Sequence, residues 1–88
     1  MERKPLEDSI REILREVGRL SIDPADLGDR EDLFAAGMTS HSSVNVMLSL
    51  EESFDFEFPE RMLRKQTFES VRAIAAALHE VGAETGPG

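Results

Sequence analysis

The sequence contains no cysteine, tryptophan or tyrosine, and its five aromatic residues are all phenylalanine. The absence of cysteine excludes disulfides, thiolate metal sites and a cysteine nucleophile. Basic residues are scarce as well, because 10 Lys and Arg stand against 18 Asp and Glu, which gives a formal net charge of −8. A protein that binds a nucleic acid backbone needs clustered basic residues, so we expect no nucleic acid partner. The negative charge suits a basic partner protein instead.

Long apolar runs are also missing. No segment approaches the roughly 20 apolar residues that a membrane-spanning helix requires. Residues 1–5 lead into an amphipathic segment and not into an apolar signal, so we expect a cytoplasmic protein with no membrane partner. The 88 residues fit one small domain, which we place at residues 1–81, with a flexible C-terminal tail at 82–88. We expect the protein to be a monomer.

Apolar residues recur at helical spacing in three parts of the sequence. They predict helices over about residues 5–18, 40–54 and 68–81. A short helix is predicted over residues 59–63, with Pro59 at its first position. No segment alternates between apolar and polar residues as a half-buried strand does. The predicted fold class is therefore all-α, a four-helix bundle of three main helices and a short third helix, with a long loop between the first two.

The connection over residues 19–39 is longer than most loops in compact domains. Its apolar residues predict an ordered loop that is anchored to the core, with a short helical turn around residues 31–36. The expected anchors are Leu20, Ile22, Leu27, Leu33 and Phe34. Gly37 would permit a sharp turn before the next helix. Thr39 is the expected N-cap of that helix, and Thr67 is the expected N-cap of the last one.

The helix predicted over residues 40–54 has more apolar residues than one core-facing stripe needs. The stripe expected in the core is Val46, Met47, Leu50 and Phe54. A neighbouring strip carries His41, Val44, Leu48 and Glu51. Two interpretations of Val44 and Leu48 remain open. They pack under the long loop, or they form an exposed docking strip beside Ser40.

Ser40 would lie in the first turn of this helix, just after a bend that contains a glycine. Free backbone N–H groups and the positive end of the helix dipole favour an anion at such a position, so a phosphate ester on Ser40 would be well accommodated. The alternative is that Ser40 is a second capping hydroxyl beside Thr39.

Several segments together resemble the acyl carrier protein family. They are Asp32-Leu33-Phe34-Ala35-Ala36-Gly37-Met38-Thr39-Ser40-His41, Leu50-Glu51-Glu52-Ser53-Phe54 and Phe58-Pro59. The resemblance implies that Ser40 carries a 4′-phosphopantetheine arm, attached as a phosphodiester by a phosphopantetheinyl transferase. The thiol of that arm would hold a cargo as a thioester. The resemblance thus implies a carrier, and not an enzyme.

Two departures from the family pattern narrow the expected partners. Thr39 and His41 flank Ser40 where the family has Asp and Leu, and residues 39–50 contain no Asp or Glu. This implies a dedicated partner in place of the general fatty-acid pathway. One subgroup of the family is similar to this sequence, the stand-alone carriers of amino acid:[carrier protein] ligases. A fatty-acyl or polyketide carrier, loaded by another acyl-loading enzyme, and an unmodified helical interaction module remain the alternatives.

The resemblance also suggests how neighbouring residues would act. Thr39 and His41 would lie beside the arm. The residues expected to contact a partner are Val44, Leu48, Glu51, Met62 and Leu63. The basic cluster Arg61, Arg64 and Lys65 has two interpretations. It serves helix capping and ion pairs with acidic neighbours, or it contacts the phosphate of the arm or a partner. His41 and His79 are not at metal-ligand spacing, so we predict no metal site.

Overall fold

The computed structural model describes residues 6–82, and within that range the chain is all-helical, with no strand. The helices are α1 (Leu6–Ile13), α2 (Ser40–Phe54) and α3 (Val71–Glu80). A π-helical turn at Leu14–Gly18 continues α1 directly. Three short 3-10 turns lie in the connections, at Pro24–Asp26, Glu60–Met62 and Lys65–Phe68. The predicted all-α class is confirmed.

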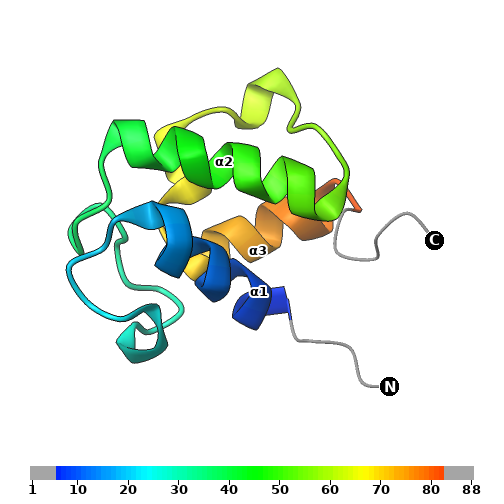
Figure 1. Cartoon of the computed structure of the whole chain (residues 1–88). Coiled ribbons are helices and arrows are strands. Elements are labelled where there is room, and N and C mark those ends of the chain that lie inside the picture. The colour runs from blue at the N-terminus through cyan, green and yellow to red at the C-terminus, as the bar shows by residue number, and fades with distance from the viewer. Residues whose placement is uncertain (1–5, 83–88) are drawn as a thin grey trace, which may run out of the picture.

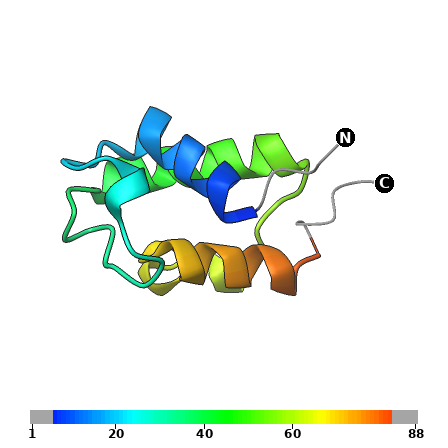
Figure 2. The same ribbon diagram turned by 90° about the horizontal axis from the view of Figure 1, so that it is seen from below.

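The three helices enclose one core. Figure 2 shows α1 and α2 together on one side of the molecule, with α3 running along the other side. The helical side chains between these layers are completely buried: Ile10, Leu14, Val46, Leu50, Ile74 and Leu78. Burying a side chain of this size contributes about 1.5–3 kcal/mol relative to leaving it in water. Of the predicted stripe on α2, Val46 and Leu50 are fully buried, while Met47 and Phe54 are partly buried against the same core.

The first helix ends where the sequence predicts. Gly18 is the last residue of the π-helical turn, and Arg19 follows in the left-handed conformation with φ 59°. A left-handed residue is a common way to end a helix. The wider π-helical geometry of the last turn has no signature in the apolar spacing. The predicted start at residue 5 lies outside the described residues.

The predictions for the third and last helices need correction. The short third helix is a single 3-10 turn at Glu60–Met62, and Pro59 precedes it as the N-cap instead of occupying its first position. The last helix begins at Val71 and not at residue 68, because Ser70 is its N-cap: the Ser70 hydroxyl accepts a hydrogen bond from the Ala73 N–H at 3.0 Å. The prediction that Thr67 caps this helix is therefore wrong.

The long loop before α2 is ordered and bonded to the end of the molecule where α3 begins (Figure 1). The Leu33 N–H donates to the Glu69 carbonyl at 2.7 Å, and the Arg72 N–H donates to the Asp29 carbonyl at 2.8 Å. The anchors Leu27 and Leu33 are buried, and Leu20 and Phe34 are partly buried. Ile22 was expected among them but is 45% exposed, so that prediction is wrong. The expected turn near residues 31–36 is present as consecutive hydrogen-bonded turns between Asp32 and Gly37.

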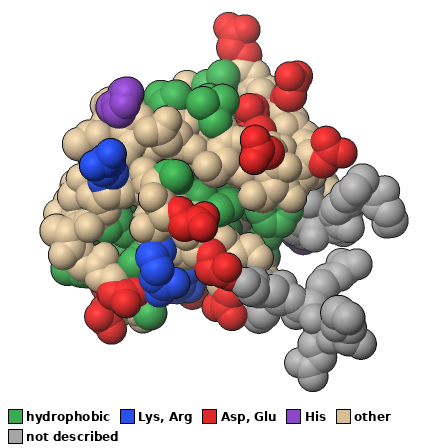
Figure 3. Space-filling model, viewed as in Figure 1, with side chains coloured by type: hydrophobic (Ala, Val, Ile, Leu, Met, Phe, Trp, Pro, Cys, Tyr) green, Lys and Arg blue, Asp and Glu red, His purple; other side chains and the backbone are tan. Residues whose placement is uncertain are grey.

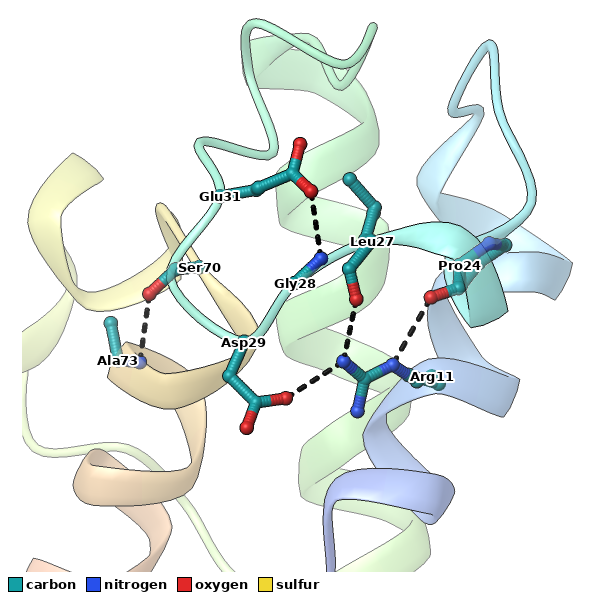
Figure 4. Close-up of polar contacts among 8 residues, drawn as sticks. All are labelled: Arg11, Pro24, Leu27, Gly28, Asp29, Glu31, Ser70 and Ala73. Carbon is teal, nitrogen blue, oxygen red and sulfur yellow. Dashed lines mark hydrogen bonds and ion pairs between the residues drawn. The ribbon is translucent and has the colours of Figure 1, made fainter.

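Arg11 of α1 fixes the middle of this loop (Figure 4). Its Nε donates to the Pro24 carbonyl at 3.1 Å, and its Nη2 donates to the Leu27 carbonyl at 2.8 Å. The same Nη2 lies 2.7 Å from the Asp29 carboxylate, and the Arg11 side chain is only 18% exposed. The rigid guanidinium thus gives the Leu27 carbonyl a donor and adds a second donor to the Pro24 carbonyl, which also accepts from the Leu27 N–H.

Asp23 caps the 3-10 turn that begins at Pro24. Its carboxylate accepts a hydrogen bond from the Ala25 N–H at 2.9 Å and pairs with Arg15 at 2.7 Å. The bond from the Ala25 N–H, followed by the bond from Arg15, holds the pKa of the Asp23 carboxyl below its usual range. Ionised Asp23 therefore ties the start of the loop to Arg15, in the π-helical turn that continues α1.

Within residues 6–82, no helix is long and apolar enough to cross a membrane. The C-terminal tail predicted at residues 82–88 lies outside the described residues, except for Gly82.

Candidate functional site

The turn before α2 depends on Gly37. Its φ is 120°, a value that side chains other than glycine rarely adopt. A Cβ at this position would lie 2.9 Å from the backbone nitrogen of Ser21, whose N–H donates to the Ala36 carbonyl at 2.8 Å. Glycine thus lets the loop segments around Ser21 and Gly37 approach each other closely, just before α2 begins.

A capping box closes the start of α2. The Thr39 hydroxyl accepts a hydrogen bond from the Ser42 N–H at 3.0 Å, and the Ser42 hydroxyl accepts one from the Thr39 N–H at 2.9 Å. The prediction of Thr39 as N-cap is confirmed. The reciprocal role of the buried Ser42 was missed, although a Thr followed three residues later by a second acceptor is the pattern of such a box.

Ser40 is the first residue of α2 and is exposed. Among residues 6–82 its hydroxyl takes part in no hydrogen bond, because Thr39 and Ser42 cap the helix between them. The interpretation of Ser40 as a second cap is therefore wrong. A free hydroxyl at the positive end of a 15-residue helix fits a phosphodiester, since backbone N–H groups of the first turn favour an anion there. His41, the next residue, is also exposed.

Apolar side chains are exposed along one strip next to Ser40. Val44 is 49% exposed and Leu48 is 52% exposed, so the interpretation that they pack under the loop is wrong. Leu63, on the segment that follows α2, is 48% exposed. We call Val44, Leu48 and Leu63 the apolar strip. Figure 3 shows hydrophobic side chains at the surface on the face that α2 crosses, with acidic side chains gathered over its C-terminal end.

Two of the residues expected to contact a partner, Glu51 and Met62, have structural contacts within this chain. The Glu51 carboxylate accepts a hydrogen bond from the Phe58 N–H at 2.8 Å and so ties the segment after α2 back to the helix. Met62 is only 6% exposed and belongs to the core. Its 3-10 turn directs the Met62 side chain inward and leaves Leu63, its neighbour, on the surface. Of the expected pair Met62 and Leu63, only Leu63 is exposed.

Ser40 also lines a surface pocket with a volume of about 250 Å³ between α2 and the segment around residues 63–68. Apolar side chains provide most of the remaining lining: Phe34, Val44, Met47, Leu63 and Phe68. Phe34 was expected only as an anchor of the loop, and Met47 only as part of the core stripe; Phe68 is buried and also reaches this pocket. Their spacing gave no sign that one edge of each would face this pocket, because the pocket is formed by three separate segments.

The basic cluster divides between two kinds of contact. Arg61 pairs with Glu80 at 2.7 Å, as the ion-pair interpretation expects. Arg64 and Lys65 line the pocket next to Ser40. The Lys65 Nζ lies 4.9 Å from the centre of the Phe34 ring, and the Arg64 Nε donates to the Arg61 carbonyl at 3.0 Å.

No group of three or more His, Asp or Glu side chains in the described part of the chain has an arrangement that could hold a metal ion.

Fold and site define a class of protein: a small helical bundle that presents a free serine at the start of its second helix, beside an apolar pocket. The sequence model described as "Phosphopantetheine attachment site" matches residues 8–78. The chain belongs to this family of phosphopantetheine-binding carrier proteins, and 4′-phosphopantetheine is its prosthetic group.

Several similar proteins are carrier proteins of one kind, which accept amino acids or are bound to a glycine:[carrier protein] ligase. The chain is 46% identical over 66 residues to an aminoacyl carrier protein from Agrobacterium fabrum, covering 75% of this chain and 80% of the relative. It also resembles the carrier protein from Agrobacterium tumefaciens in a crystal structure with an engineered Bradyrhizobium japonicum glycine:[carrier protein] ligase and ATP. The TM-score is 0.84 at 39% identity, over 86% of this chain and 99% of the other.

A third relative is a glycylated carrier protein, in its crystal structure with the Bradyrhizobium japonicum glycine:[carrier protein] ligase. Its TM-score is 0.69 at 27% identity, and the match covers 81% of this chain and 95% of the other.

Proposed function

We propose that this protein is an aminoacyl carrier that holds a small amino acid on a 4′-phosphopantetheine arm attached to the Oγ of Ser40. The observation that carries the proposal is the free, exposed hydroxyl of Ser40 at the start of α2, in a chain of the phosphopantetheine attachment family. In the modification, Ser40 Oγ bonds to the phosphorus of the pantetheine phosphate of coenzyme A. Adenosine 3′,5′-bisphosphate leaves, and the hydroxyl proton passes to a base of the phosphopantetheinyl transferase.

The prosthetic group supplies the thiol that a chain without cysteine lacks. The residues of this chain orient that thiol and present it to partners, and they take no catalytic part. Thr39 and Ser42 fix the first turn of α2 and so fix the direction of the Ser40 side chain. The transferase and an amino acid:[carrier protein] ligase supply the catalysis. The ligase joins the carboxylate of the amino acid to the α-phosphate of ATP, and pyrophosphate leaves. AMP leaves when the thiol of the arm attacks the aminoacyl adenylate and the thioester forms.

An amino acid cargo is supported by two observations. The relative with 46% identity is an aminoacyl carrier, and one structural relative carries glycine. The pocket next to Ser40 is a surface feature of about 250 Å³, below the 300–1,000 Å³ or so that is typical of sites enclosing a ligand. A small amino acid needs no enclosed cavity, whereas a long fatty acyl chain would need one to be shielded from water.

The loading reaction tests this proposal. The protein is first converted to its holo form with coenzyme A and a phosphopantetheinyl transferase. It is then incubated with glycine, ATP and the Bradyrhizobium glycine:[carrier protein] ligase, and its intact mass is measured. We expect a gain of one glycyl unit that hydroxylamine removes, as expected of a thioester. Ser53→Ala is the matched control, because Ser53 is exposed near the C-terminal end of α2, outside the pocket beside Ser40, and should leave loading unchanged. Holo protein that accepts long acyl chains but no amino acid would favour the fatty-acyl alternative.

We further propose that the apolar strip of Val44, Leu48 and Leu63 is the surface that docks the ligase. The strip adjoins Ser40, and residues 39–50 carry no acidic side chain, so the contact beside the arm is apolar and not ionic. Leu48→Ser should raise the KM of the ligase for the holo carrier by about ten-fold, since losing one buried leucine at an interface costs about 1–2 kcal/mol. Ile22→Ser is the control, because Ile22 is similarly exposed but lies on the loop. Equal KM values for the two variants would reject this surface.

A further inference from the structure

The pocket beside Ser40 combines an apolar lining with positive charge. Val44 and Leu63 contribute exposed apolar side chains. Among the described residues that line the pocket, Arg64 and Lys65 are the only ionisable ones. Ser40 and Val44 are four residues apart on α2 and therefore lie on one helical face. Whatever is attached to Ser40 starts at the edge of this pocket.

The two cations of the pocket lack acidic partners, although the chain is strongly acidic. Arg11, Arg15 and Arg61 each lie 2.7 Å from a carboxylate oxygen. In contrast, no carboxylate within residues 6–82 pairs with Arg64 or Lys65. The Lys65 ammonium lies over the Phe34 ring, and the Arg64 Nε is bonded to a backbone carbonyl. The absence of Asp and Glu from residues 39–50 keeps this region locally positive in a protein of net charge −8.

We infer that this pocket is the resting site of the arm, with Lys65 as the residue that positions it; the inference rests on attachment at Ser40. The phosphodiester carries one negative charge, which the Lys65 ammonium and the Arg64 guanidinium neutralise. The carbon bearing the two methyl groups of the pantoyl unit follows the phosphate after one CH₂ group. Those methyl groups pack on Val44 and Leu63, and the thiol end extends beyond the small pocket.

The docked arm is readily released. Ion pairs between exposed groups contribute little, and the lysine already has a favourable contact with the Phe34 ring in the absence of phosphate. The arm therefore exchanges between the pocket and free solution. This suits a carrier, because a tightly held arm would not reach the active site of a ligase.

NMR spectroscopy of the holo protein tests this inference. We expect nuclear Overhauser effects between the pantoyl methyl protons and the methyl protons of Val44 and Leu63. Conversion of apo to holo protein should also shift the amide signals of Met47 and Phe68, which line the pocket but lie away from the attachment point. Lys65→Gln should reduce the docked fraction about two- to five-fold, the range expected for losing an exposed ion pair.

Matched variants test the positive charge of Lys65 and the apolar contact of Leu63 separately. Lys65→Arg should restore the Overhauser effects, because it keeps the positive charge. Arg30→Gln removes the same charge from the exposed loop and should leave the effects unchanged. Leu63→Ser, at an exposed position, should weaken the effects to Val44 while the apo spectrum stays that of the folded protein.

Two negative outcomes are distinguishable. Wild-type protein that gains the mass of phosphopantetheine but shows no pantoyl Overhauser effects, with shifts confined to residues 39–42, would overturn the resting site and leave the carrier function intact. The resting site would also be overturned if Lys65→Gln and Arg30→Gln retained equal effects. Failure to gain the mass at all would contradict the proposed function itself.

Discussion

Replacing Arg11 by methionine should destabilise the protein far more than replacing its neighbour Arg15. Methionine keeps the apolar stem of the side chain but removes the guanidinium. The Leu27 carbonyl then loses this donor, and the Pro24 carbonyl keeps only its bond from the Leu27 N–H. Hydrogen bonds from charged donors contribute about 1.5–3 kcal/mol each where the groups are shielded, and less where water can replace the donor. The Asp29 carboxylate is more than half exposed and adds at most about 1 kcal/mol.

These contributions sum to a loss of about 2–4 kcal/mol for Arg11→Met, because water reaches the loop carbonyls in part. For a domain of this size, such a loss lowers Tm by about 10–25 °C. Arg15→Met removes a single ion pair whose two side chains are about half exposed, so it should cost about 1 kcal/mol or less. Urea and thermal unfolding followed by circular dichroism measure both variants. Equal stabilities would refute the assignment of Arg11 as the anchor of the loop.

Three further substitutions test the loop and the start of α2 by urea unfolding. Gly37→Ala should lower the free energy of unfolding by about 1–3 kcal/mol, because residue 37 has a positive φ and its Cβ would lie close to the Ser21 nitrogen. Gly28→Ala is the control and should be nearly neutral, because its Cβ would meet only the flexible side chain of Glu31. Ser42→Ala should cost about 1 kcal/mol through loss of the capping box; a similar loss in Ser43→Ala would contradict this. Asp23→Asn should destabilise the protein near pH 7 but not in strong acid. The pKa of Asp23 is lower in the folded protein than in the unfolded chain. Its contribution to stability is therefore present at pH values above the pKa of the unfolded chain and is lost as the pH falls through the pKa of the folded protein. An equal loss of stability in Asp23→Asn at both pH values would refute this role of Asp23.

Features that depend on local sequence could be predicted. The bounds of α2, its Thr39 cap and the sharp turn at Gly37 agree with the structure, because helical periodicity, capping hydroxyls and glycine act within a few residues of one another. The free hydroxyl of Ser40 follows from the same local rules, once Ser42 is recognised as the second member of the capping box. The resemblance to a family supplied the prosthetic group, which local rules alone left open.

Features that depend on contacts between distant segments could not be predicted. The N-cap of α3 is Ser70 and not Thr67. The preceding Glu69 carbonyl bonds to the Leu33 N–H of the long loop, and such a backbone bond between distant segments leaves no trace in side-chain spacing. The contact between Lys65 and Phe34 likewise joins residues from two connections. Exposure of Val44 and Leu48 remained undecided for the same reason, since the path of the loop settles what it covers.

The most direct test of the central claim is the intact mass of the wild-type protein and of Ser40→Ala after incubation with coenzyme A and a broad-specificity phosphopantetheinyl transferase. Ser43→Ala serves as the control, because its hydroxyl also lies in the first turns of α2. The account predicts a gain of one phosphopantetheine unit in the wild type and in Ser43→Ala, and no gain in Ser40→Ala. A gain that persists in Ser40→Ala, or no gain in any folded protein with several transferases, would contradict it.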